Sequence, residues 1–436
     1  MLRSVHFTSV RGFHSAAVLS AKAAAPVKKK AVHGYKKVGG GQSKKTSGVG
    51  KFFHEYVSEQ KLDLKADELN GVDILKKSTK ENTVVKYSQL HMKKLIIAGN
   101  FKHNQYRELF KTPITLVTKD TLKMSKFVEN SIESSSKDNR ICILGENGIG
   151  KSTLLGQTQA LISDQGNSII LPIPYATQLV NGRNDYYFDK NLNTYIQPMY
   201  LKSFLHKIRT INQEILKKIP IQSEYSFEGN TRYKSILKAT PKRDTLFELT
   251  NLRVTPRQRG KQLEAIINEL SKQSEIPVFL TVDNFSAITS NPRTEYRDVN
   301  NSKIHVSKFQ LSSLILDFAQ GSKNFQKGGV ILVTSTDDKP SPTLYAGLGL
   351  ATVDPYTKNT VYDHEVASKL KGVESFDMSR FSKENVSSIV KKFIDAKIFN
   401  NNELKSNSVD SIINQKYILS GNGNPGELIK SILFLH

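Results

Sequence analysis

The chain has 436 residues, of which 38% are hydrophobic and 24% are charged, and these values are ordinary for a globular protein with a buried core and more than one domain. The net charge of +23 favours a polyanionic partner, either nucleic acid or an acidic membrane surface. The lone cysteine, Cys142, excludes an internal disulfide and a cysteine-ligated zinc site, and no apolar run is long enough to span a bilayer.

The N-terminus has the composition of a mitochondrial transit peptide. Residues 1–51 contain eleven Lys or Arg and no Asp or Glu, and the opening MLRSVHFTSVRGFHSAAVLSAKAAA adds serine, alanine and spaced apolar residues. We expect residues 1–30 to be this import signal, with a basic tail that has no addressing role as the alternative. The rest of the chain, after residue 51, contains 52 basic and 40 acidic residues. This broad excess of positive charge favours a nucleic-acid neighbour.

Residues 31–117 are expected to form an extended, basic and irregular N-terminal arm. The stretch KKKAVHGYKKVGGGQSKKTSGVGK is of low complexity and cannot bury apolar surface, so we expect it to be disordered until it meets phosphates or a protein groove. Residues 52–117 mix short apolar runs with charged stretches and show no clear period. We interpret them as a partner-binding arm.

From Thr118 onward the sequence predicts an α/β fold. Thr118 is a candidate helix cap, and apolar residues follow it at helical spacing. These residues are Met124, Phe127, Val128 and Ile132. Helices beginning at Lys151 and covering 261–270 then alternate with apolar strands, which indicates a parallel sheet flanked by helices. The expected strands cover residues 141–144, 168–173, 277–283 and 328–335.

The C-terminal part of the sequence has a different character. A helix is predicted over residues 379–399, with Val386, Ile389, Val390 and Phe393 on one face. No further buried strand is apparent, so residues 346–436 are expected to form a mainly helical lid domain.

A glycine-rich loop follows the first predicted strand. Its sequence GENGIGKS matches the phosphate-loop (P-loop) pattern GxxxxGK[ST]. The candidate nucleotide-binding residues are Gly145, Glu146, Asn147, Gly148, Ile149, Gly150, Lys151 and Ser152. The glycines let consecutive N–H groups face an anion, Lys151 would reach the β- and γ-phosphates, and Ser152 would ligate Mg²⁺. Residues 118–345 are expected to be the nucleotide-binding domain, with a degenerate, empty loop as the alternative.

A second acidic residue is expected at the end of a neighbouring strand. VFLTVD ends at Asp283, the best candidate to hold Mg²⁺ through water, although an ordinary strand-end role is the alternative. In hydrolytic relatives such as AAA+ proteins a glutamate commonly follows and polarises the attacking water. Here Asn284 follows and cannot accept that proton. We therefore expect weak or absent hydrolysis, unless Glu146 or another acid substitutes.

Other candidates carry weaker signals. Thr334 and Ser335 end the strand VILVTS where a γ-phosphate sensor would lie, but polar strand ends are common. Four arginines could meet the phosphates of nucleotide or RNA, or be solvated surface charges: Arg257, Arg259, Arg293 and Arg297. The segment GNGNP (421–425) has turn chemistry. The ten histidines form no metal-spaced cluster, and no serine or cysteine triad is suggested.

With these motifs in place, the chain resembles the mitochondrial small-ribosomal-subunit proteins of the death-associated protein three family. The likeness covers about residues 85–436 and rests on an ordered set of segments. After the P-loop these segments are IILPIPYATQLVNGRNDY (169–186), QLEAIINELSKQ (262–273), VFLTVDNFSAI (278–288), GGVILVTST (328–336) and YILSGNGNPGEL (417–428).

This resemblance implies a P-loop domain of the AAA+/STAND type in the head of the mitochondrial small subunit. It implies binding of GTP or GDP with Mg²⁺; no base-reading motif is present, so ATP is also possible. The implied partners are small-subunit ribosomal RNA, neighbouring ribosomal proteins and the large subunit across a bridge, with the chain as a monomer in the matrix ribosome.

Carried over by position, the phosphate and Mg²⁺ residues are Gly145, Gly148, Gly150, Lys151, Ser152 and Thr153. Asp283 would be the second acid, and the turn Gly423-Asn424-Pro425 would place the helical lid over the nucleotide. Three functions follow: a structural ribosomal protein stabilised by its nucleotide, an active AAA+ or STAND-type ATPase, or a switch governed by nucleotide state.

Overall fold

The structure is a computed structural model that describes residues 67–68, 81–102, 110–229, 235–335, 340–353, 356–358, 361–399, 404 and 407–433. Residues 57–436 form one compact unit. The expected import signal (1–30) and the low-complexity stretch after it lie outside the described residues.

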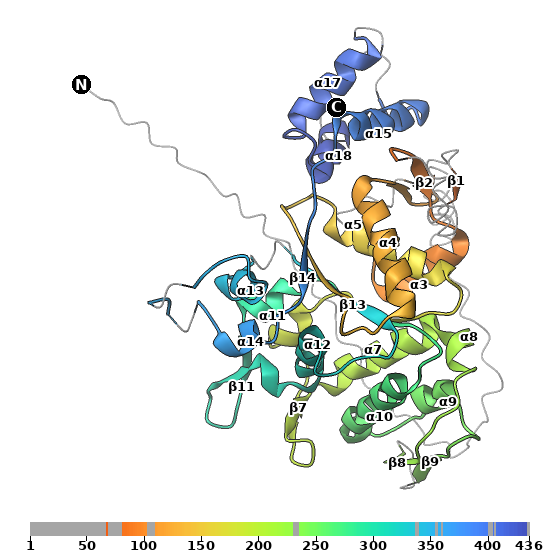
Figure 1. Cartoon of the computed structure of the whole chain (residues 1–436), viewed down its shortest axis with the longest axis vertical. Coiled ribbons are helices and arrows are strands. Elements are labelled where there is room, and N and C mark those ends of the chain that lie inside the picture. The colour runs from red at the N-terminus through yellow and green to blue at the C-terminus, as the bar shows by residue number, and fades with distance from the viewer. Residues whose placement is uncertain are drawn as a thin grey trace, which may run out of the picture. The chain divides into compact units, whose positions relative to one another are not determined.

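A parallel sheet of five strands forms the core of this unit, in the order β14-β4-β13-β10-β5. Figure 1 labels two of these strands, β13 and β14. The strands are β4 (Arg140–Leu144), β5 (Ile169–Ile173), β10 (Val278–Val282), β13 (Gly328–Val333) and β14 (Glu374–Asp377). Strands β5, β10 and β13 are buried at every position, as expected where helices cover both faces. The four predicted strands and the α/β class are confirmed.

Strand β14 was not predicted from the sequence. It lies inside the region expected to be helical, and it pairs in parallel with β4 from Glu374 opposite Ile141 to Asp377 opposite Leu144. Its four residues, ESFD, are only exposed or half-buried because the strand forms an edge of the sheet. An edge strand this short and polar leaves no hydrophobic run for sequence reasoning to detect.

Helices on the two faces of the sheet build two hydrophobic cores. Neighbouring residues of a strand point to opposite faces, so Ile141 lies in one core and Cys142 in the other. The first core is covered by α4 (Lys119–Glu133) and α5 (Lys151–Asp164). The second core is covered by α7 (Pro198–Ile211), α10 (Arg259–Lys272) and α12 (Gln310–Gln320). Thr118 caps α4 through a capping box, as predicted.

Shorter elements connect these layers. The helices are α6 (Thr177–Val180), α8 (Gln213–Leu216), α9 (Leu246–Asn251), α11 (Ser286–Ser290), α13 (Pro342–Gly347) and α14 (His364–Ser368). Antiparallel hairpins are formed by β6 (Tyr187–Asp189) with β7 (Thr194–Ile196), β8 (Tyr225–Glu228) with β9 (Ile236–Ala239), and β11 (Arg293–Arg297) with β12 (Lys303–His305).

The segment before Thr118 is ordered where the structure describes it. The strands β1 (Asp67–Glu68), β2 (Val84–Lys86) and β3 (Ile114–Leu116) form a small sheet, and α3 (Gln89–Ala98) follows β2. Val85 and Leu95 pack against Leu161 of α5. The prediction of an irregular arm is therefore wrong for this part. Helix α3 escaped detection because its apolar residues surround it: Leu90 and Ile96 are exposed, so no single apolar stripe marks it.

Three C-terminal helices pack around a hydrophobic core that also includes Phe110. They are α15 (Lys383–Asp395), α17 (Val409–Leu419) and α18 (Pro425–Leu433). Val386, Val390 and Phe393 of α15 lie in this core, as their spacing predicted. The helix expected over 379–399 is shorter, because Ser382 forms the N-cap of α15 and caps it in a box with Asn385.

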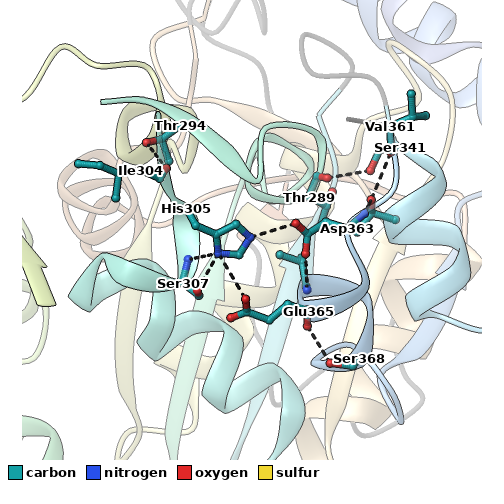
Figure 2. Close-up of polar contacts among 12 residues, drawn as sticks. Thr289, Thr294, Ile304, His305, Ser307, Ser341, Val361, Asp363, Glu365 and Ser368 are labelled. Carbon is teal, nitrogen blue, oxygen red and sulfur yellow. Dashed lines mark hydrogen bonds and ion pairs between the residues drawn. The ribbon is translucent and has the colours of Figure 1, made fainter. Parts of the chain in front are cut away.

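A polar cluster around His305 joins the β11–β12 hairpin to α14 (Figure 2). His305 Nε2 lies 3.0 Å from Asp363 Oδ2, and its Nδ1 lies 2.7 Å from Ser307 Oγ and 3.7 Å from Glu365 Oε2. The other Asp363 oxygen, Oδ1, caps α14 by accepting from the Val366 N–H at 3.0 Å. Among the described residues, no group of three His, Cys, Asp or Glu could hold a metal ion.

Candidate nucleotide-binding site

The loop between β4 and α5 adopts a backbone that requires glycine. Gly145, Gly148 and Gly150 have φ values of 145°, 74° and 99°, in the region where a side chain is strained. A Cβ on Gly148 would also lie 2.7 Å from Asn424 Oδ1. The motif glycines are therefore needed for both the curl of the loop and the close approach of its neighbour.

The start of α5 presents its backbone donors without a side-chain cap. Gly150 occupies the N-cap position and makes no side-chain capping bond, and no acidic residue lies in the first turn. The first N–H groups of a helix lack partners within the helix and carry the positive end of its dipole. Ser152 and Thr153 lie in this first turn, and a helix start of this kind can bind anions.

Lys151 is buried under the loop. Its Nζ donates to the carbonyl oxygens of Gly145 and Glu146, each at 2.8 Å. Burial lowers the pKa of Lys151 to about 8, and the negative charge of Asp283 opposes this shift. The ammonium of Lys151 therefore lies under the loop, and the charge of Asp283 acts on it.

Asp283 lies immediately after β10 and is buried. Its Oδ2 lies 2.7 Å from Lys102 Nζ, and its Oδ1 accepts the Asn284 N–H at 2.8 Å. Lys102 Nζ also donates to Asn284 Oδ1 at 2.9 Å and lies 4.6 Å from the centre of the Tyr175 ring. Sequence reasoning missed Lys102, since it was one lysine among many in a segment with no motif.

Thr334 supports the loop from β13. Its hydroxyl donates to the Ile143 carbonyl at 3.0 Å, and its N–H donates to the same oxygen at 3.1 Å. The residue therefore fixes the end of β4 just before the loop begins. Because its hydroxyl proton is already used, the geometry favours this supporting role over the γ-phosphate sensor.

The GNGNP turn contacts the loop at Asn147 and Gly148. Asn424 Nδ2 donates to the Asn147 carbonyl at 2.7 Å, and its Oδ1 accepts the Gly426 N–H at 3.0 Å, which caps α18. The Gly426 N–H also lies 2.9 Å from the Gly148 carbonyl. The structure thus brings Asn424, predicted from the resemblance, directly onto the predicted phosphate loop.

Glu146 faces the C-terminal helices as well. Its Oε2 lies 2.7 Å from one guanidinium nitrogen of Arg380, and both side chains are about half exposed. A second Arg380 nitrogen donates to the Gly421 carbonyl at 2.7 Å. Glu146 therefore links loop and turn at the protein surface, a position unsuited to holding an attacking water.

An apolar cavity of about 160 Å³ adjoins the start of α5. Three parts of the chain line it: the loop and α5, the segment before Thr118, and the C-terminal helices. Representative lining residues are Ile149, Ser152, Thr153, Tyr87, Phe101 and Phe393. A cavity of about 150 Å³ can hold a benzene ring, so this space is large enough for one aromatic ring.

The four arginines considered from sequence lie elsewhere. The guanidinium of Arg259 is turned to the Pro198 carbonyl at 2.9 Å, and Arg297 contacts the Asn301 carbonyl in its own hairpin. Neither these two nor Arg257 and Arg293 line the cavity. Their expected contact with nucleotide finds no support in the geometry, and contact with RNA stays a prediction.

A family model described as mitochondrial ribosomal death-associated protein 3 matches residues 115–431. The chain belongs to this family. The death-associated protein 3 family is mitochondrial, and the chain is accordingly a protein of the mitochondrial matrix. The match includes β4, the loop, Asp283 and the GNGNP turn, whereas Lys102 and the cavity-lining residues before residue 115, such as Tyr87 and Phe101, lie outside it.

Two curated relatives are named "Small ribosomal subunit protein mS29". The protein from Schizosaccharomyces pombe is 25% identical over 329 residues, which are 74% of this chain and 65% of the relative. The protein from Neurospora crassa is 24% identical over 353 residues, which are 76% of this chain and 70% of the relative. The chain thus spans slightly less than two thirds of the length of the S. pombe protein.

A solved structure described as the ADP form of the Aeropyrum pernix ORC2 protein covers 72% of this chain and 60% of its own. Its TM-score is 0.32 at 11% identity, which is too distant to bear on the site.

Within the part of the chain that the structure describes, no helix has the length and apolar character needed to cross a membrane.

Proposed function

We propose that the chain is a structural component of the mitochondrial small ribosomal subunit that holds a nucleoside di- or triphosphate with little or no hydrolysis. The family and the names of both relatives support the ribosomal part. The net charge of +23 suits a neighbour rich in phosphate, such as ribosomal RNA. The expected partners are this RNA, adjoining ribosomal proteins and the large subunit, with one copy of the chain in each ribosome.

The observation that carries the nucleotide proposal is that Lys151 lies beneath the glycine-rich loop and donates to two of its carbonyl oxygens. Three glycines with positive φ values and an uncapped helix start offer backbone donors, and a buried ammonium lies beneath them. Lys151 now bonds to two carbonyl oxygens, which phosphate oxygens would replace as stronger, charged acceptors. Gly145 to Thr153 are the residues that we propose to hold the phosphates.

The apolar cavity is the proposed place of the nucleobase. It adjoins Ser152 and Thr153 and is walled by aromatic rings such as Tyr87 and Phe101, which suits the flat face of a base. The family resemblance favours guanine. Asn100 and Thr115 are polar side chains in the lining that could distinguish guanine from adenine by hydrogen bonds.

Two features support slow or absent hydrolysis. Asn284 follows Asp283 and its amide oxygen accepts from Lys102, so it cannot serve as a general base. Glu146, the other candidate, is paired with Arg380 at the surface. The nucleotide would then act as a stabiliser: a ligand at a tenfold excess over its Kd contributes about 1.4 kcal/mol to folding stability.

Sedimentation of a mitochondrial lysate in high salt tests this proposal. We expect the chain to travel with the small subunit, and a free or hexameric pool would instead indicate an active ATPase. Phosphate release by the purified particle is the second measurement. A turnover of about one per second is a rate of ordinary enzymes. Such a turnover would contradict a structural role if it were lost in Lys151→Ala.

A further inference from the structure

Lys102 lies outside residues 115–431, which the family model matches, and forms an ion pair with Asp283. The pair is buried, with exposed side-chain fractions of 14% for Lys102 and 3% for Asp283. The ammonium group has three partners: a carboxylate oxygen at 2.7 Å, the Asn284 amide oxygen at 2.9 Å and the Tyr175 ring. The ammonium is therefore held beside Asp283 by three contacts.

The backbone around Lys102 is positioned by close contacts. Helix α3 ends at Gly99 with φ of 93°, and a Cβ there would lie 2.6 Å from the Pro174 ring. Asn100 then donates to Gln159 of α5, and Gln159 donates to Thr281 of β10 at 2.8 Å. These contacts fix the end of α3 against both α5 and the strand that carries Asp283, which places Lys102 beside the carboxylate.

The expected Mg²⁺ fits this arrangement poorly. Both Asp283 oxygens are already engaged, by Lys102 and by the Asn284 N–H, and Ser152 would be the other protein ligand. Lys151 is close enough for the charge of Asp283 to act on it. Among the protein groups alone, a divalent cation at Asp283 would therefore face two buried ammonium groups and one carboxylate, which is unfavourable where the local dielectric constant is low.

We propose that Lys102 takes the place of the metal at Asp283, so that this chain binds its nucleotide without a divalent cation. The inference rests on the proposed nucleotide function. Lys102 then neutralises Asp283 in the metal's place, and Lys151 supplies positive charge to the phosphates. The chemistry recognised is a nucleoside diphosphate or triphosphate, with the metal dispensable.

Binding of fluorescent mant-GDP and mant-ADP to the full-length chain tests this, with Mg²⁺ present or removed by EDTA. We expect the wild-type affinity to change by less than about threefold on removing Mg²⁺, because the charged contact of Lys102 with Asp283 remains when the metal is absent. In Lys102→Met we expect affinity in EDTA to fall by at least about tenfold, the effect of losing one charge-assisted contact, and Mg²⁺ to restore it.

Two further variants act as controls. Lys102→Arg keeps the charge, so most of the metal independence should remain. Lys93→Met removes an exposed lysine of α3 in the same segment and should behave as wild type. A wild-type loss of tenfold or more in EDTA, equalled by Lys102→Met, would overturn the inference while leaving nucleotide binding intact.

A measurement on the wild-type chain alone avoids any folding defect of a variant. Equilibrium dialysis of the GDP-loaded chain against Mn²⁺ should show no ion bound with the nucleotide, and one ion retained per loaded chain would overturn the proposal. Absence of binding of both nucleotides, with and without Mg²⁺, would overturn the inference together with the proposed function.

Discussion

The P-loop and the His305 cluster are both rich in polar side chains, yet they differ in what their polar atoms do. Around His305, Asp363 uses one oxygen to cap α14 and the other to bind the histidine, so the cluster satisfies itself and joins two segments. At the loop, the helix start has no side-chain cap and Lys151 bonds only to backbone carbonyls. The candidate site is therefore distinguished by the uncapped N–H groups at the start of α5 and by the Lys151 ammonium, and not by the number of charged side chains.

The largest expected effect is on nucleotide binding by Lys151→Ala. Removing the ammonium under the loop should lower affinity for mant-GDP by about a hundredfold, since a contact to a phosphate in a buried site is worth up to about 3 kcal/mol. Fluorescence titration measures it. The matched change in the other cluster, His305→Ala, should leave the affinity unchanged; equal losses in the two variants would erase the contrast between the regions.

Glycine substitution separates the loop from an ordinary turn. Gly148 and Gly166 have nearly the same φ, 74° and 72°, but only at Gly148 would a Cβ meet a neighbour within 3 Å. Gly148→Ala should lower the free energy of unfolding by about 1–3 kcal/mol more than Gly166→Ala does, because strain is common to both and the clash with Asn424 is not. Denaturant unfolding checks this, and similar losses would show that the contact with Asn424 is loose.

The pKa of Lys151 predicts a pH effect confined to the loop. With a pKa of about 8 in the ligand-free chain, the ammonium loses its proton as the pH rises above this value, whereas bound phosphates favour the charged form. Affinity should therefore fall about tenfold between pH 7 and pH 9, with proton uptake on binding in this window. Calorimetry in buffers of different ionisation enthalpy detects the uptake; pH-independent affinity would contradict the assignment.

The smallest effect is expected for the stability of His305→Ala. It removes the contacts to Asp363 and Ser307 that join the hairpin to α14, which should cost about 1 kcal/mol. Thermal unfolding with hydrogen exchange of residues 293–305 and 364–368 would show the change locally. A reduced nucleotide affinity in this variant would mean that the two regions are coupled.

Sequence reasoning reached much of this arrangement because strong local patterns encode it. The four apolar strands, the cap at Thr118 and the loop glycines each depend on neighbouring residues alone. Strand β14 and helix α3 were missed because one is a polar sheet edge and the other lacks a single apolar face. Lys102 was missed for another reason: its role depends on Asp283, 181 residues later in the sequence, and only the folded chain brings them together.

The nucleotide content of the native assembly tests the central claim most directly. Small subunits purified from mitochondria are extracted with acid, and their guanine and adenine nucleotides are quantified by mass spectrometry against the amount of this chain. We predict one di- or triphosphate per wild-type chain and less than about a tenth of this in assemblies carrying Lys151→Ala, the occupancy left after a hundredfold loss of affinity when free nucleotide is about ten times the wild-type Kd. Wild-type particles without nucleotide would contradict the account.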